Sequence, residues 1–167
     1  MLEFMVIQEI LIMDSLVMLD INIQLEKKLL QLVIDILDIL DGLWWTIDRH
    51  LTLEQTYLSA IATYIDCIKN GVTTVFDHHA SFGAIEGSLF KIAEASEKMG
   101  VRSCLCYEVS DRDGEEKAKA SVKENADFIK YAAQQNNDMI KAMMGMHAQF
   151  TISDKTFEMC RENMQEA

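Results

Sequence analysis

The feature that most constrains the fold is a regular alternation, from residue 51 onward, of strand-forming and helix-forming runs. Apolar or β-branched runs lie at residues 72–76, 101–109 and 139–150, about one every 30 to 40 residues. Segments with helical periodicity lie between them. Strands that are apolar along their whole length and separated by helices are typical of a parallel sheet covered on both faces, or of a barrel. We therefore predict an α/β fold with parallel strands.

The helix-forming runs carry clear start and stop signals. Thr52 and Gln55 have the spacing of a capping box, which predicts that a helix begins there. Asn70 and Gly71, which tolerate positive φ, are expected to end it. Three more helices are expected, at residues 83–99, at residues 115–135 and from Ser153 onward.

Composition excludes several classes of partner. The chain has 167 residues and carries 15 Lys and Arg against 27 Asp and Glu, a net charge of −12. The basic clusters that nucleic acid or an anionic membrane surface would need are missing. The most apolar stretch, residues 29–45, is interrupted by Asp35, Asp38 and Asp41, whereas a spanning helix needs about 20 nearly uncharged residues. We predict no nucleic-acid or membrane partner.

Four cysteines are too few for a disulfide scaffold in a chain of this length. They favour a reducing cytoplasm, which is the location that we expect. Residues 1–42 do not share the rhythm of the later chain, and they are predicted as a divergent N-terminal segment. This segment forms either one or two helices, or a strand and a helix. Residues 43–167 form the regular α/β part.

Polar side chains follow the apolar runs at the point where each predicted strand ends. These side chains are Asp77, His78, His79, Glu108 and His147. Right-handed crossovers place the carboxyl ends of parallel strands at one edge, where sites in such folds are built. Adjacent strand residues point to opposite faces, so one of the paired histidines is expected to face the site and the other to pack under the following helix.

Two interpretations of these residues stay open. The histidines can be site residues, with Asp77 and Glu108 orienting them or binding a metal. Alternatively, His147 is a structural histidine, and the two carboxylates bond to backbone or cap helices. The chain lacks a Gly-x-Gly-x-x-Gly turn, a Walker phosphate loop, a Gly-x-Ser-x-Gly elbow, and the His-x-His and His-Glu-x-x-His metal motifs. Nucleotide-phosphate binding is therefore unsupported.

Three stretches resemble a known family. They are GLWWTIDRHLTLEQTYLSAIATYIDCIKNGVTTVFDHHAS, SLFKIAEASEKMGVRSCLCYEVSDRDG and MGMHAQFTIS. Together they resemble the aminohydrolase/chlorohydrolase branch of the amidohydrolase superfamily, and within it the aminohydrolases associated with selenium metabolism. The resemblance covers residues from about 38 to 167.

The resemblance implies a (β/α)₈ TIM-type barrel, of which the three predicted strands are the second, third and fourth. It implies hydrolytic deamination or dechlorination of nitrogen heterocycles by water that a zinc or iron ion activates. It also implies a substrate contact for His147, and a place at the barrel mouth for His78 and His79.

One departure from the family pattern limits these expectations. The first metal motif of the family, His-x-His, is expected within residues 1–37, which contain no histidine. The remaining metal ligands of the family fall beyond Ala167. We therefore expect no metal site, and no activity, in the isolated chain. The alternative is a non-catalytic truncated homologue that acts by protein association, including self-association through open sheet edges.

Overall fold

The computed structural model describes residues 39–135 and 137–166. Of the segment 1–42 that is predicted as divergent, residues 1–38 lie outside this part of the chain. Three strands form one sheet: β1 (Thr74–His79), β2 (Arg102–Tyr107) and β3 (Ile140–Ala142). The helices are α4 (Trp45–Asp48), α5 (Leu53–Lys69), α6 (Ser88–Met99), α7 (Glu115–Gln134) and α8 (Asp154–Glu166), with short η1 (Leu40–Trp44) and η2 (Gln149–Thr151).

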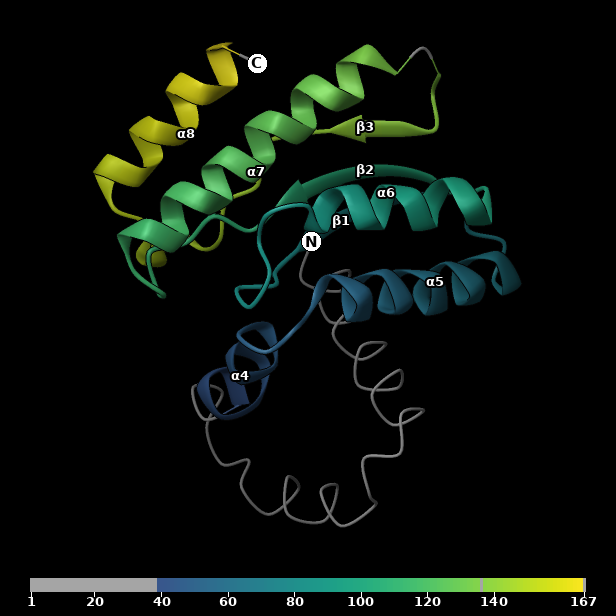
Figure 1. The fold of residues 1–167 in the computed structure, drawn as a ribbon, viewed down its shortest axis with the longest axis horizontal. Helices are drawn as coiled ribbons and strands as arrows, with labels where there is room; N and C mark the ends of the chain where they lie inside the picture. The colour runs from purple at the N-terminus through teal and green to yellow at the C-terminus, as the bar shows by residue number, and fades with distance from the viewer. Residues whose placement is uncertain (1–38, 136, 167) are drawn as a thin grey trace.

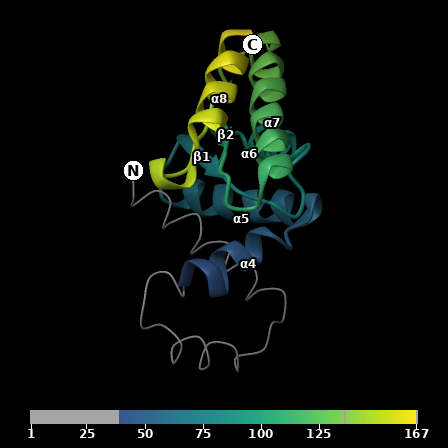
Figure 2. The same ribbon diagram turned by 90° about the vertical axis from the view of Figure 1, so that its left-hand side faces the viewer.

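The strands are parallel and follow the order β1-β2-β3 (Figure 1). Each neighbouring pair is connected by a helix, α6 between β1 and β2 and α7 between β2 and β3. The predicted α/β class with parallel strands is confirmed. α8 lies alongside α7 at the end of the described chain (Figure 2).

The predicted helix signals act as expected. The Thr52 side chain accepts a hydrogen bond from the Gln55 N–H, and the Gln55 side chain accepts one from the Thr52 N–H, so the capping box is complete. Asn70 closes α5, and Ser153 accepts a hydrogen bond from the Thr156 N–H at the start of α8.

α6 begins later than predicted, at Ser88 instead of residue 83. Its first turn has no capping side chain of its own. Instead, Glu124 of α7 accepts hydrogen bonds from the N–H groups of Gly87, at 2.8 Å, and Leu89, at 2.9 Å. A buried carboxylate from the neighbouring helix therefore satisfies backbone donors at the start of α6.

The third strand is shorter than predicted. The apolar run 139–150 forms regular strand only at Ile140–Ala142, with one further bridge between Val109 and Met146. The backbone of Gly145 comes so close to β2 that a Cβ there would overlap the Tyr107 carbonyl oxygen. Its N–H bonds to the side chain of Asn125 at 3.3 Å. The ladder is interrupted because a helix side chain takes the place of a strand partner.

The two faces of the sheet differ. On the helix-facing side, Leu105, Tyr107 and Ile140 are buried in one cluster with side chains of α5, α6 and α7. On the other side, called the open face below, Phe76 leaves 64% of its surface exposed and Met143 leaves 40% exposed. Among the described residues, helices cover one face of the sheet. A sheet covered on one face fits part of a TIM-type barrel better than a sheet covered by helices on both faces.

Within residues 39–135 and 137–166, no helix is long and apolar enough to cross a membrane.

Candidate functional site

The carboxyl ends of the three strands bring together three of the predicted residues. His78 lies at the end of β1, and Glu108 directly follows β2. The His78 Nδ1 atom lies 3.9 Å from Oε2 of Glu108. His147 follows β3, and its N–H donates to the Val109 carbonyl at 2.9 Å, which holds it beside the end of β2. The expected grouping at one edge is present.

The adjacent histidines point to opposite faces, as the strand geometry predicts. His79 is 3% exposed on the helix-facing side, where its Nε2 lies 2.9 Å from the Ser81 hydroxyl and its ring meets Tyr107 edge-on. Complete burial lowers the pKa of His79 to about 3, so its imidazole is neutral. His78 faces the open side, and its side chain is 25% exposed. Burial lowers the pKa of His78, while the Glu108 carboxylate opposes that change.

His147 is held by one side chain. Its Nδ1 lies 2.7 Å from the Thr151 hydroxyl, and that hydroxyl donates its proton to the Ala148 carbonyl at 2.7 Å. The hydroxyl oxygen is then left to accept, so we assign the imidazole proton to Nδ1. Burial, followed by the Arg112 charge, lowers the pKa of His147. A neutral imidazole with a lone pair on Nε2 follows.

Asp77 lies apart from His78, Glu108 and His147. It lies on the same side of β1 as His79 and lines a cavity of about 150 Å³ between α5 and β1. Tyr64 and Cys67 line the same cavity. The prediction grouped Asp77 with the other strand-end residues, but the alternation of the strand separates it from His78 and Glu108.

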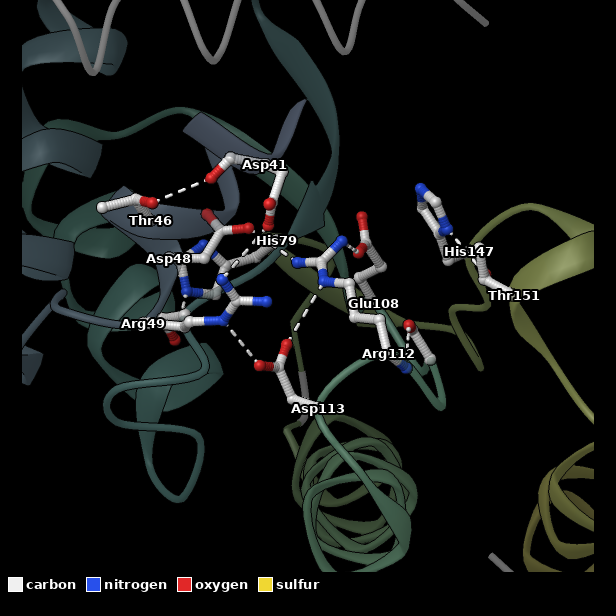
Figure 3. A network of polar contacts seen from close by, with 12 residues as sticks. Asp41, Thr46, Asp48, Arg49, His79, Glu108, Arg112, Asp113, His147 and Thr151 are labelled. Carbon is white, nitrogen blue, oxygen red and sulfur yellow. Dashed lines mark hydrogen bonds and ion pairs between the residues drawn. The ribbon is translucent and has the colours of Figure 1, made fainter. Parts of the chain in front are cut away.

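Arg112 is the residue that sequence reasoning missed. Its guanidinium lies 2.6 Å from Glu108, 2.6 Å from Asp48 and 3.5 Å from Asp113 (Figure 3). Burial raises the pKa of Glu108, and Arg112 together with His78 opposes that rise. The available signal in the sequence is the charged run 110–114, which begins two residues after the strand-end glutamate.

Aromatic rings flank this guanidinium. The Arg112 Cζ atom lies 4.5 Å from the centre of the Phe82 ring and 5.1 Å from that of Trp45. Arg49 extends the network, since its Nε lies 2.7 Å from Asp113. The network thus joins α4 to the loop between β2 and α7.

The described residues do not fit a catalytic metal. No group of three or more His, Cys, Asp or Glu within residues 39–135 and 137–166 is placed to hold an ion. His78 and Glu108 supply two donors at most, and the Arg112 guanidinium already neutralises that carboxylate. A catalytic zinc site typically takes three protein ligands.

Comparison with known proteins now defines the class. The model of the amidohydrolase family matches residues 23–167, so the chain belongs to that family. The match begins inside the segment 1–42 that was predicted as divergent. Members of this family generally use a metal.

Three curated relatives are deaminases. The 5-methylthioadenosine/S-adenosylhomocysteine deaminase of Thermococcus sibiricus is 26% identical over 80% of this chain and 30% of its own length. The 5'-deoxyadenosine deaminase of Methanobrevibacter smithii is 29% identical over 68% of this chain and 25% of its own length. The 5'-deoxyadenosine deaminase of Methanocaldococcus jannaschii is 30% identical over 65% of this chain and 24% of its own length. The chain thus spans 30% or less of the length of these relatives. No solved structure gives a significant match.

Proposed function

We propose that this chain carries strands two to four of an amidohydrolase barrel whose complete form hydrolytically deaminates a nucleoside-like heterocycle. The observation that carries the proposal is the gathering of His78, Glu108 and His147 at the carboxyl ends of parallel strands. Active sites of barrels lie at these ends. The deaminase names of the relatives favour an amino leaving group over the chloride that the resemblance also allows.

His147 and His78 are the residues that we expect to contact the heterocycle. Deamination replaces an exocyclic amino group with oxygen from water, and the amino nitrogen takes up a proton as it leaves as ammonia. Before that step the amino group carries N–H donors, so a hydrogen-bond acceptor can orient it in the bound substrate. The Nε2 lone pair assigned to His147 supplies one. Neutral His78 beside Glu108 supplies a second polar contact on the open face. The substrate role of His79 stays a prediction, and its burial favours a supporting position instead.

Charge around the site favours an uncharged nucleoside over a nucleotide. The network at the strand ends contains four carboxylates and two guanidinium groups: Asp41, Asp48, Glu108, Asp113, Arg49 and Arg112. Both guanidinium groups are already paired with these acids. A substrate phosphate would meet net negative charge and find its natural partners occupied.

The metal would be held elsewhere in the complete enzyme. Zinc or iron is the identity that the resemblance implies, and its role is to activate water. Since the described residues lack a ligand set, we expect the isolated chain to bind no catalytic metal and to be inactive.

Reconstitution tests this function. The chain is mixed with the two parts of the Methanobrevibacter smithii deaminase that precede and follow its matched region, because residues 1–37 lack the first metal motif of the family, and ammonia release from 5'-deoxyadenosine is measured. We expect release that His147→Ala lowers at least tenfold, and that the exposed-residue control His50→Ala leaves unchanged. A complex that forms but releases no ammonia, or release that does not depend on His147, would contradict the proposal.

A second candidate is a non-catalytic protein that acts by association. The specific observation is that β1 pairs within the described chain only with β2, and its Phe76 is 64% exposed. β1 also has no Lys or Pro, which commonly protect edge strands. Analytical ultracentrifugation should then show self-association that Phe76→Lys weakens and that Phe157→Lys, on exposed α8, leaves unchanged. A monomer at high concentration would rule this candidate out.

We also infer a cytoplasmic location. Cys67, Cys104, Cys106 and Cys160 are all free thiols, as expected in a reducing compartment. Recovery of the protein with the soluble cytoplasmic fraction of its cells would support this inference, and recovery from an oxidising compartment would contradict it.

A further inference from the structure

Arg112 occupies an unusual position for a loop residue. Its side chain is only 7% exposed, although it lies in the turn between β2 and α7. Three carboxylates and two aromatic rings surround it. A buried guanidinium is costly unless charged partners and hydrogen bonds compensate it. A residue in a turn does not need three charged partners and two rings for the turn to form, so these contacts point to a further role for Arg112.

The contact with Glu108 has a geometric consequence. The Nη1 atom of Arg112 donates to Oε1 of Glu108 at 2.6 Å, while Oε2 of the same carboxylate faces Nδ1 of His78 at 3.9 Å. One oxygen is therefore fixed by Arg112, and the other is presented to the imidazole. Because a carboxylate is planar, fixing one oxygen also restricts where the second one points.

The contact with Asp48 acts on a second segment. Neither η1 nor α4 contains a buried residue, so these short helices have little apolar attachment. The Nη2 atom of Arg112 donates to Oδ2 of Asp48 at 2.6 Å, and the guanidinium lies over the Trp45 ring. The Asp48 carbonyl also accepts a hydrogen bond from the Gly83 N–H at 2.8 Å.

We propose that Arg112 is a positioning residue: its guanidinium holds the Glu108 carboxylate against His78 and, through Asp48, fixes α4 to the same strand end. Its importance for turnover rests on the proposed deaminase function. The coupling of Arg112, Glu108 and His78 is a property of this chain alone and is testable without activity.

The charges that face His78 come from several elements. Glu108 follows β2, Arg112 lies in the β2–α7 loop, and His147 follows β3. Burial lowers the pKa of His78 most, the Glu108 carboxylate raises it, and protonation of His147 and the Arg112 charge lower it further. Removal of Arg112 alone therefore changes His78 in two opposing ways. A double-mutant cycle separates them.

The experiment is an NMR pH titration of the His78 imidazole in the full chain. In the wild-type background, Glu108→Gln should lower the pKa of His78 by about half a unit or more, because a nearby negative charge is lost. In the Arg112→Met background, the same substitution should change the His78 pKa by less than half as much. Amide exchange of residues 45–51 should also accelerate in Arg112→Met, because α4 loses its fixed partner.

Two further variants keep the test decisive. Arg112→Lys retains the charge but not the fork of donors, so it should restore part of the coupling and less of the α4 protection. It also replaces Arg112→Met if that variant does not fold. Arg161→Met removes an exposed ion pair on α8 and should leave both measurements unchanged. An equal Glu108→Gln effect with and without Arg112 would overturn the proposal.

The outcomes distinguish this proposal from the proposed function. Intact coupling in a chain that never supports deamination would leave Arg112 as a positioning residue and reject the deaminase. Deamination that depends on His147, in a chain without the coupling, would support the deaminase and reject Arg112 as a positioning residue.

Discussion

On one face of the sheet, helices completely bury Leu105, Tyr107 and Ile140. On the other face, Phe76 is 64% exposed. Both faces carry apolar residues, so composition does not distinguish them. What differs is the number of partners within the described chain. One face is a finished core, and the other is the kind of surface that the interior of a closed barrel presents.

The polar residues divide in the same way. His79, on the helix-facing side, is neutral and bonded to Ser81, whereas His78, one residue earlier, reaches the strand-end network. The finished face thus supplies stability, and under the proposed function the carboxyl edge supplies the chemistry. Active sites of barrels lie at the carboxyl ends of the strands.

The largest expected effect comes from truncating one apolar residue on each face. Leu105→Ala should lower the free energy of unfolding by about 2–5 kcal/mol, because it leaves a cavity in a packed core. Phe76→Ala should change it by less than about 0.5 kcal/mol, because the ring is mostly exposed. Urea unfolding of both variants measures the difference. Equal losses would mean that the open face is covered in solution.

The second effect uses the adjacent histidines. The pKa of His79 falls from 6.5 to about 3 on folding. Below about pH 6.5 the unfolded chain binds a proton that the folded chain rejects, so stability is present above that pH and is lost as the pH falls toward 3. We expect a loss of about 2 kcal/mol between about pH 7 and pH 5 from this group.

His79→Gln should remove most of that pH dependence, and His78→Gln should remove less, because His78 is partly exposed. Urea unfolding at both pH values provides the measurement. A larger change in His78→Gln would reverse the assignment of the two faces.

The third effect concerns the close approach of Gly145 to β2. Gly145→Ala should destabilise the protein by about 1–3 kcal/mol, because the new methyl group would meet the Tyr107 carbonyl and the Cys106 side chain. Gly42→Ala is the matched control, since no atom of the described residues lies within 4 Å of a Cβ at that position. Thermal unfolding of the two variants checks this, and equal midpoints would show that β3 can shift away from β2.

The smallest effect is on the tautomer of His147. Thr151→Val should cost about 1 kcal/mol, because it removes the hydroxyl that pairs with Nδ1. Nitrogen NMR shifts should then show a mixture of tautomers, whereas Thr151→Ser keeps the hydroxyl and the Nδ1–H form. An unchanged tautomer in Thr151→Val would remove the reason for assigning the lone pair to Nε2.

Local signals made much of the fold predictable. The capping box at Thr52 and Gln55 and the N-cap at Ser153 depend on neighbours three residues away, which a sequence displays directly. The end of β3 was not predictable in this way. It depends on Gly145 meeting Tyr107 and on Asn125 reaching across from α7, and these contacts join distant parts of the chain.

The same distinction between local signals and distant contacts applies to the residues of the candidate site. His78, Glu108 and His147 were predicted because parallel strands bring their carboxyl ends to one edge. Arg112 was missed because its partner Asp48 lies 64 residues earlier and its rings come from two other segments. Asp77 was grouped with these residues because it also ends a strand, but the alternation of side chains along β1 places it on the opposite face from His78.

The carboxylate that Glu124 supplies to the start of α6 also has a consequence for the order of folding. Gly87 and Leu89 precede it by 37 and 35 residues, respectively. As a ribosome releases the chain from its N-terminus, the first turn of α6 has no acceptor until much of α7 has emerged. These two helices are therefore expected to consolidate together, and the first half of the sheet gains its covering helix late in synthesis.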